Sequence, residues 1–395
     1  MAKPKIRFNG YTEDWEQRKL GDVFEQTSNL VNPKEDEIEL WSLTVEDGLT
    51  KKSDRYNREF LVKKDDNFKE VRPGDIVYNP MNMTLGAVGY NGMAKSVAVS
   101  GYYTTMVAKE NYDTYYINTW LKSPQAIRLY RTYATGSLIE KQRVQFPTLS
   151  IIPVAFPKYE EQTKIGNYFH FLDNLITLHQ RKCEQTKTLK KYMLQKMFPQ
   201  DGEKVPQIRF EGFTEDWEQR KLGDVFKEYS EKNHTELPAL TIIQGGGTVK
   251  REESDRNLMY DESNLSNYKM VRKNDFIVHL RSFEGGLEKS SLDGIISPAY
   301  HTFHSDVADS RFYYSYFRSH EFIKHKLVPH VYGIRDGRSI DITGMKTIEI
   351  PYTSMEEQRK IGDYLEFLDH LITLHQRKCD ELKEVKKFML QNMFV

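Results

Sequence analysis

The chain of 395 residues is a duplication in which nearly constant segments alternate with divergent ones. The run TEDWEQRKLGDVF occupies Thr12–Phe24 and returns unchanged at Thr214–Phe226. The run LITLHQRKC occupies Leu175–Cys183 and returns at Leu371–Cys379. The stretches between these runs have diverged almost beyond recognition. Because a recurring sequence predicts recurring structural units, we expect two domains of one fold that carry different surfaces, related by a pseudo-two-fold internal repeat.

The composition narrows the class of protein. The formal net charge is zero, which does not exclude a nucleic-acid partner, because binding depends on how charge is distributed. No apolar run approaches the roughly 20 residues that cross a bilayer, and the start MAKPKIRFNG lacks the apolar core of a signal peptide. Cys183 and Cys379 are the two cysteines and are expected to be reduced, buried thiols. We therefore expect a cytoplasmic protein with no membrane partner.

The first repeated run contains a buried anchor. Thr12 or Asp14 can cap a short helix that leads into Trp15, and the copy at Trp217 keeps the same features. We interpret both tryptophans as core residues rather than as stacking platforms.

The divergent stretches, residues 25–150 and 227–346, have the pattern of short strands and helices. VRPGDIVYN at Val71–Asn79 predicts a turn followed by a buried strand, and VRKNDFIVH at Val271–His279 is its counterpart. A glycine-containing loop with cations follows later in each half, at Gly136–Arg143 and Gly333–Ser339. The order of elements agrees between the halves.

The end of each half has the periodicity of a long helix. Apolar residues recur at three- and four-residue spacing from Glu160 to Met197, and the second copy repeats this pattern. About 40 residues make a helix near 60 Å long at 1.5 Å per residue. Two such helices can bury each other in a coiled coil, and a pseudo-two-fold axis makes the pair antiparallel. The predicted coiled-coil core comprises Leu172, Leu175, Ile176, His179, Cys183, Leu368, Leu371, Ile372, His375 and Cys379.

Two details of these helices are also predicted. We expect His179 and His375 to face each other near the crossing, as a polar layer rather than as a metal or catalytic site. Lys187, Lys190, Lys191 and Lys196 crowd the last turns of the first helix, where they complement the helix dipole.

The expected fold class is α+β, with two similar mixed α/β domains joined by two long antiparallel helices. We expect a first domain at 1–155, with its constant segment at 4–24, and a first long helix at 156–200. A second domain follows at 201–351, with its constant segment at 206–226, and a second long helix at 352–395.

Catalytic motifs are absent from the sequence. It contains no phosphate-binding loop, no G-x-S-x-G elbow, no HExxH pair and no cysteine cluster. NPMN at Asn79–Asn82 lacks the second proline and the aromatic residue of the N-P-P-aromatic loop of adenine methyltransferases. A catalytic set would appear in both halves, or in one with decay in the other, and it appears in neither. We expect a non-catalytic binding protein without a metal or cofactor of its own.

Duplex DNA suits two similar heads held at a fixed separation, because half-sites on one side of the duplex lie about 34 Å apart or at a multiple of that distance. Polar and basic side chains of the loops could contact base edges and phosphates. For any one of these cations, an ordinary solvated surface position explains the residue equally well. The candidate DNA-binding residues are Lys51, Lys52, Arg55, Asn82, Thr84, Lys141, Gln142 and Arg143 in the first half, and Arg251, Arg256, Arg281, Ser282, Arg335 and Arg338 in the second.

The repeated segments resemble those of a known family. WEQRKLGDVF at the start of each half, and EEQ-x-KIG followed by FLD-x-LITLHQRK at its end, look like the specificity subunits of type I restriction-modification enzymes. The resemblance covers essentially the whole chain. It implies two target recognition domains, each reading one half of a bipartite site in double-stranded DNA. It implies also that the constant helices set the spacer and dock two methyltransferase subunits, with two restriction-translocase subunits completing the complex.

The resemblance further implies that S-adenosylmethionine, ATP and Mg²⁺ belong to the partner subunits, since the family has no catalytic residues of its own. Two rival hypotheses remain at this point. One is a coiled-coil protein–protein scaffold with two ligand-binding heads, which a gel shift with duplex DNA would distinguish. The other is a self-sufficient methyltransferase fusion, which would bind S-adenosylmethionine by itself.

Overall fold

The computed structural model describes residues 3–46, 48–51, 67–136, 142–200, 202–254, 262–279, 286–333 and 339–395. The chain folds into two compact units. Unit 1 comprises Met1–Gln180 with Arg377–Val395, and unit 2 comprises Arg181–Gln376. The two longest helices, α5 (Tyr159–Lys196) and α9 (Met355–Asn392), each have 38 residues and each contribute to both units. The predicted pair of long helices is therefore confirmed, and the four-part division by residue number stays a prediction.

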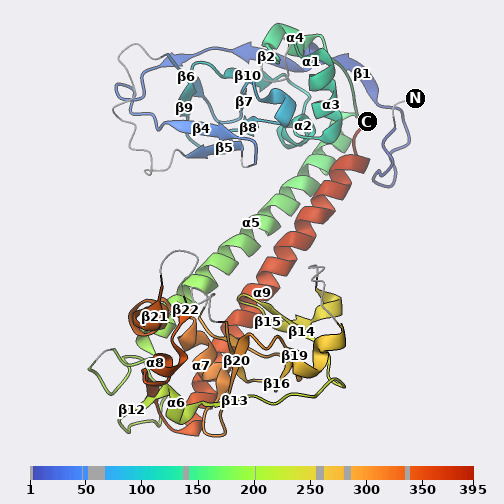
Figure 1. The fold of residues 1–395 in the computed structure, drawn as a ribbon. Coiled ribbons are helices and arrows are strands. Elements are labelled where there is room, and N and C mark those ends of the chain that lie inside the picture. Colours follow the sequence, from blue (N-terminus) through green and yellow to red (C-terminus); the bar gives the residue numbers. More distant parts are fainter. Residues whose placement is uncertain are drawn as a thin grey trace. The chain divides into compact units, whose positions relative to one another are not determined.

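Unit 1 is built from short antiparallel strands and short helices around one end of each long helix (Figure 1). Its strands are β1 (Glu16–Lys19), β2 (Phe24–Thr27), β3 (Leu30–Val31), β4 (Trp41–Thr44), β5 (Gly48–Lys51), β6 (Phe68–Val71), β7 (Ile76–Tyr78), β8 (Val88–Tyr90), β9 (Val97–Ser100), β10 (Thr104–Ala108) and β11 (Pro153–Phe156). Its shorter helices are α1 (Leu20–Val23), η2 (Met83–Leu85), α2 (Thr114–Leu121), α3 (Pro124–Tyr133) and α4 (Phe146–Ser150).

Unit 2 has a similar set of elements. Its strands are β12 (Glu218–Lys221), β13 (Lys227–Tyr229), β14 (Leu240–Ile243), β15 (Gly247–Lys250), β16 (Lys269–Val271), β17 (Phe276–His279), β18 (Glu288–Lys289), β19 (Gly294–Ile296), β20 (Tyr300–His304), β21 (Val331–Tyr332), β22 (Ser339–Ile340) and β23 (Glu349–Tyr352). Its shorter helices are α6 (Leu222–Val225), η4 (Arg251–Glu253), η5 (Glu262–Asn267), α7 (Ser310–Phe317), the π-helix η7 (Phe322–Leu327), η8 (Val328–His330) and α8 (Ile342–Lys346).

The two units share one sheet topology. A four-stranded antiparallel sheet has the order β2-β10-β7-β8 in unit 1 and β13-β20-β17-β18 in unit 2. The lysine on the strand before the turn makes the same contact in both: Lys69 Nζ donates to the carbonyl of Tyr103, and Lys269 Nζ to that of Tyr300, each at 2.7 Å. The prediction of two copies of one fold is confirmed.

The first constant run differs from its predicted local structure. No helix capped by Thr12 or Asp14 leads into Trp15; instead Glu16–Lys19 forms strand β1, which pairs with β11 from the far end of the domain. A long-range pairing partner outweighs the local helix preference here. The burial of Trp15 and of Trp217 is as predicted, and each belongs to the main apolar core of its unit.

The long helices run antiparallel within each unit (Figure 1). In unit 1, Asp173 of α5 pairs with Lys386 of α9 at 2.5 Å, and the Phe169 ring stacks on Phe394. In unit 2, Lys190 of α5 pairs with Asp369 of α9 at 2.6 Å. The predicted core residues that are buried are Leu172, Ile176, Cys183, Leu368 and Cys379, whereas Leu175, His179, Leu371, Ile372 and His375 are half-buried.

Three further expectations concern these helices. Both cysteines are buried free thiols, as expected. His179 belongs to unit 1 and His375 to unit 2, so their facing each other stays a prediction. Within the described residues, no helix has both the length and the apolar character that crossing a membrane requires.

Candidate nucleic-acid interface and repeated helix surfaces

In each unit, an equivalent buried ion pair joins the constant segment at the start of the domain to the long helix that follows the domain. The guanidinium of Arg7 makes two bonds of 2.7 Å to the carboxylate of Glu161, and Arg209 contacts Glu357 in the same way at 2.6 and 2.9 Å. The hydrogen bond to Glu161 raises the pKa of Arg7. Two parallel N–H···O bonds fix both distance and orientation. The constant segment before each domain is thereby joined to the helix that follows the domain.

The glutamine after each of these glutamates makes a second repeated link. Gln162 Oε1 accepts from the backbone N–H of Asp113, and Gln358 Oε1 accepts from that of Asp309. These two aspartates cap α2 and α7 through hydrogen bonds to the first turn. The motif E-E-Q therefore has the same folding role in both halves.

Folding does not account for all of the identity between the copies. Within LITLHQRKC, the side chains of Thr177, Leu178, Gln180, Arg181 and Lys182 are exposed, and so are those of Thr373, Leu374, Gln376, Arg377 and Lys378. Exposed helix positions tolerate substitution at little cost in stability.

Exposed apolar side chains on the long helices follow the same repetition. Unit 1 exposes Phe171 and Leu178 on α5 and Val385 and Phe388 on α9, and unit 2 exposes the equivalent residues, Phe367 and Leu374 on α9 and Leu189 and Tyr192 on α5. Each set combines two residues seven apart on one helix with two residues three apart on the other, and both spacings keep side chains on one helix face. Phe171 and Phe367 remain 59% and 54% exposed. Exposed apolar side chains of this kind are candidates for protein–protein contact. We call these the unit 1 patch and the unit 2 patch.

The predicted DNA-binding residues of unit 1 lie in two regions. Asn82 and Thr84 belong to the turn at η2, directly after β7, where Asn82 is exposed and Thr84 is buried. Gln142 and Arg143 follow the glycine loop, and the N–H of the adjoining Val144 donates to the carbonyl of Pro80 at 2.9 Å. The structure therefore brings Asn82, Gln142 and Arg143 into one neighbourhood.

The remaining described candidates lie elsewhere. Lys51 ends the β4–β5 hairpin and lies 3.5 Å from Glu39, as an exposed ion pair. In unit 2, Arg251 begins η4 and stacks at 5.7 Å over the ring of Tyr268. The other candidates, Lys52, Arg55, Lys141, Arg256, Arg281, Ser282, Arg335 and Arg338, lie outside the described residues.

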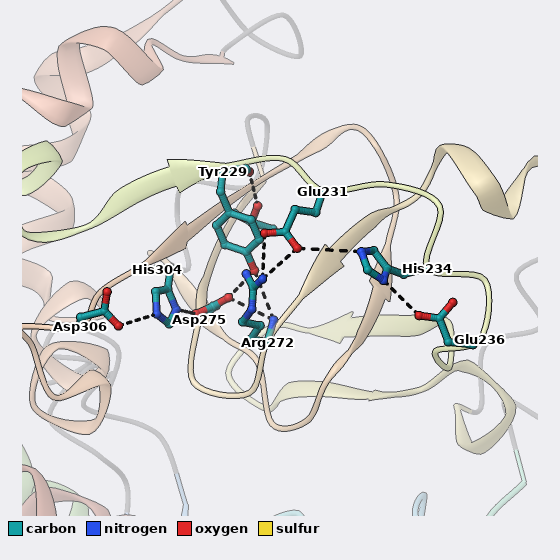
Figure 2. Close-up of polar contacts among 9 residues, drawn as sticks. Tyr229, Glu231, His234, Glu236, Arg272, Asp275, His304 and Asp306 are labelled. Atoms are coloured by element: carbon teal, nitrogen blue, oxygen red, sulfur yellow. Dashed lines mark hydrogen bonds and ion pairs between the residues drawn. The ribbon is translucent and has the colours of Figure 1, made fainter.

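Sequence reasoning missed a polar network on the sheet of unit 2, shown in Figure 2. Asp275 is buried, accepts a hydrogen bond from the Tyr229 hydroxyl and lies 2.5 Å from Nδ1 of His304. The hydrogen bond to Asp275 raises the pKa of His304, and burial raises that of Tyr229. Arg272 donates from Nη2 to both carboxylate oxygens of Glu231, each at 2.8 Å, and stacks on the Tyr229 ring.

Of this network, unit 1 keeps only the buried aspartate. Asp75 occupies the place of Asp275 and accepts from the N–H of Arg72, and burial raises its pKa. The strand registers put Val107 and Thr27 where unit 2 has His304 and Tyr229. The conserved aspartate closes the turn in both units, whereas the histidine and tyrosine are particular to unit 2. Among the described residues, no group of three or more potential ligands is placed to hold a metal ion.

The comparisons with known proteins agree with the repeat. The family model of the type I restriction modification DNA specificity domain matches twice, at residues 12–188 and 214–384. The chain is 23% identical, over 97% of its length and 93% of the relative's, to a protein of Methanocaldococcus jannaschii named putative type I restriction enzyme MjaX specificity subunit. It is 25% identical to the type I restriction enzyme MjaVIII specificity subunit of the same organism, over 95% and 91%. The crystal structure of a type I restriction-modification S subunit from M. genitalium has the same fold, with a TM-score of 0.65, 16% identity and coverage of 100% and 99%.

Proposed function

Because the chain belongs to the family of type I restriction-modification DNA specificity domains, we propose that each of its two units reads one half of a bipartite DNA target. In this proposal the long helices set the number of unread base pairs between the half-sites and dock the catalytic subunits. Specificity then belongs to this chain, and methylation and cleavage belong to its partners.

The observation that carries the proposal is the distribution of identity between the two halves. The sheets share one topology, but their loops differ in sequence, as domains that read different half-sites require. The long helices instead repeat exposed side chains, including Leu178 and Leu374. The divergent loop surfaces suit two different half-sites, and the repeated helix surfaces suit two copies of one subunit.

The partner that the repeated surfaces fit is a methyltransferase subunit, bound once by each unit. The unit 1 patch and the unit 2 patch offer the apolar contacts, and the exposed Arg181, Lys182, Arg377 and Lys378 offer charges nearby in sequence. An adenine inside a duplex is inaccessible to a methyltransferase unless it is flipped out of the stack. Docking beside each recognition domain would present one enzyme to each half-site. Two restriction-translocase subunits would complete the assembly and supply ATP-dependent chemistry.

The loop residues of unit 1 that converge near η2 are the proposed reading groups of the first half-site. Asn82 and Gln142 carry amide groups that can pair with adenine, and Arg143 carries the guanidinium that pairs with guanine in the major groove. The candidates of unit 2 stay proposals in the same sense. Among them, Arg251 is the described one.

Sequencing of duplexes selected by the assembled complex from a random pool tests the proposal. We expect two short fixed motifs separated by a spacer of constant length and free sequence. Arg143→Ala should relax the first motif and leave the second unchanged, because each good base contact contributes about 1–3 kcal/mol at its own position. A single contiguous motif, or equal loss in both motifs, would contradict the division of reading between the units.

A further inference from the structure

Unit 2 contains a groove of about 1050 Å³ between its variable domain and the constant helices. Its lining includes Lys187, Lys190 and Lys191 on α5, and Lys289, Arg311 and Arg318 from the variable domain. Eight lysines and arginines and three acidic residues line the groove, and the carboxylates of Glu184, Glu288, Asp309 and Asp363 pair with three of these cations from outside the lining. An excess of positive charge in a concave surface attracts polyanions.

The groove cations are held in position by contacts inside the protein. Lys190 Nζ lies 2.6 and 2.7 Å from the two carboxylate oxygens of Asp369, and Arg318 pairs with Glu288. Lys187 lies three residues before Lys190 and four before Lys191, so its side chain is a neighbour of both on the helix surface. Lys187 Nζ in turn lies 2.7 Å from the carboxylate of Glu184 on the same helix.

Lys289 contributes a second feature that favours an anion. Its side chain is 15% exposed, with Glu366 as an ion-pair partner at 3.9 Å, and burial lowers its pKa. A half-buried ammonium that lacks close solvation is stabilised when an opposite charge approaches. An anion in the groove would supply that charge.

The matching place in unit 1 has a different chemistry. The strand registers put Tyr90 opposite Ile76 where unit 2 has Lys289 opposite Phe276. Tyr115 has the position of Arg311, two residues after the helix cap, and its ring lies 5.8 Å from that of Tyr90 and 4.1 Å from His170. An aromatic cluster in unit 1 therefore stands where unit 2 has Lys289 and Arg311.

We propose that the groove of unit 2 holds the phosphate backbone of the target duplex, with Lys187 and Lys191 of the constant helix and Lys289 of the variable domain as phosphate-contacting residues. This inference rests on the proposed function and adds to it. The helix α5 is then part of the DNA-binding surface as well as a spacer. The contacts with the DNA phosphate backbone then differ between the units, and unit 2 supplies more of the affinity that is independent of sequence.

The test compares two double variants of the full chain in complex with its methyltransferase. Lys187→Gln/Lys191→Gln removes charge from the groove, and Lys383→Gln/Lys387→Gln makes the same change at the matching positions of α9 in unit 1. Affinity for a duplex of random sequence is measured between about 50 and 200 mM salt. Each lost phosphate contact lowers the slope of log affinity against log salt by about 0.9, so the first variant should lose about 2 and the second should keep the slope of the unaltered chain.

Lys289→Gln should lower the slope by about 1 and weaken selected and random duplexes by the same factor. An unchanged slope in the groove variants, or an equal loss in the unit 1 variant, would overturn the inference. Loss of affinity accompanied by loss of the methyltransferase in native mass spectrometry would also overturn it, because the lysines would then belong to docking. The inference would also be overturned if the chain bound ATP saturably and Lys289→Gln abolished that binding while leaving the affinity for the duplex unchanged.

These measurements distinguish a failure of the groove assignment from a failure of the proposed function. Unaltered salt dependence in a complex that still selects a bipartite target overturns the groove assignment alone. Failure of the unaltered complex to bind any duplex overturns both.

Discussion

Glu161 and Glu357 hold equivalent positions at the starts of the two long helices, and each is almost completely buried. Glu161 pairs with Arg7, whereas Glu357 accepts hydrogen bonds from Arg209, from Trp217 Nε1 at 3.0 Å and from the hydroxyl of Thr353. Trp15, the counterpart of Trp217, makes no hydrogen bond through Nε1 among the described residues. Glu357 of unit 2 therefore accepts hydrogen bonds from more side chains than its counterpart Glu161 does in unit 1.

This difference predicts unequal costs for the same substitution. Glu161→Gln and Glu357→Gln each break a buried ion pair and leave a guanidinium poorly compensated, which costs about 3–5 kcal/mol. We expect the larger loss for Glu357→Gln. Hydrogen–deuterium exchange in β11 and β23 assigns the loss to each unit, since these strands lead into the two helices. Equal loss of protection in both strands would contradict the difference in hydrogen bonding.

His304 predicts a pH dependence that is particular to unit 2. Its pKa is raised because Asp275 and Asp306 accept its hydrogen bonds, so the folded state favours the charged ring. The resulting stabilisation is fully present below the ordinary histidine pKa of about 6.5 and is lost as pH rises through the raised value. Because the side chain is 40% exposed, solvent screening limits the effect to about 1 kcal/mol or less.

His304→Val introduces the residue found at the matching position of unit 1 and should remove this dependence. The measurement is the urea midpoint of the unit 2 unfolding transition at pH values on either side of the raised pKa. We expect the unaltered chain to be more stable at the lower pH and the variant to lose that difference. An equal pH response in the variant would assign it to other groups, such as the pair of Glu228 and His301 in the same sheet.

At the scale of elements, the long helices are the proposed ruler between half-sites. A heptad inserted after Gln180 in α5 and after Gln376 in α9 preserves the antiparallel apolar register, because it adds two helical turns to both partners. It lengthens each helix by about 10 Å at 1.5 Å per residue, which is about three base-pair steps of 3.4 Å. We expect the selected spacer to grow by about three base pairs while both motifs stay the same. Selection from a random pool measures this, and an unchanged spacer would show that the helices do not set it.

The sequence predicted those elements whose signals are local or repeated. The spacing of Leu172, Ile176 and Cys183 defined a helix of nearly the observed length, and the recurring tryptophan identified the core of each unit. Strand β1 was assigned wrongly, because the capping residues Thr12 and Asp14 are a local signal, whereas β1 is fixed by pairing with residues 153–156. The helix preference of a short segment is weaker than a complete set of strand hydrogen bonds.

The groove and the network around Asp275 had no local signal. Lys187, Gly245, Lys289 and Arg318 come from four separate segments of the chain, and tertiary packing alone brings them to one surface. The lysines of α5 were noticed in the sequence and were interpreted only as partners of the helix dipole. His304 reaches Asp275 because β20 pairs with β17 in a register that the sequence does not specify. Groups of residues that strand register, or packing between domain and helix, brings together can be identified only in the three-dimensional structure.

At the scale of the whole molecule, duplication predicts stoichiometry. The unit 1 patch and the unit 2 patch have matching residues, so one chain should bind two copies of the same methyltransferase at independent sites. Binding sites that share no residues contribute additively. A change in one patch should therefore remove one copy without weakening the other.

Leu178→Asp and Leu374→Asp place a charge in the unit 1 patch and the unit 2 patch, respectively. Both side chains are about half exposed, at 45% and 50%, so the chain should still fold, whereas a buried unpaired carboxylate in the docked complex is strongly unfavourable. Native mass spectrometry of the chain with excess methyltransferase should give two copies for the unaltered protein, one for each single variant and none for the double variant. Ile151→Asp is the control, because Ile151 is at least as exposed, at 56%, but lies outside the repeated helices. If a single variant lost both copies, the two patches would form one composite site, and the dual presentation of methyltransferases to two half-sites would be wrong.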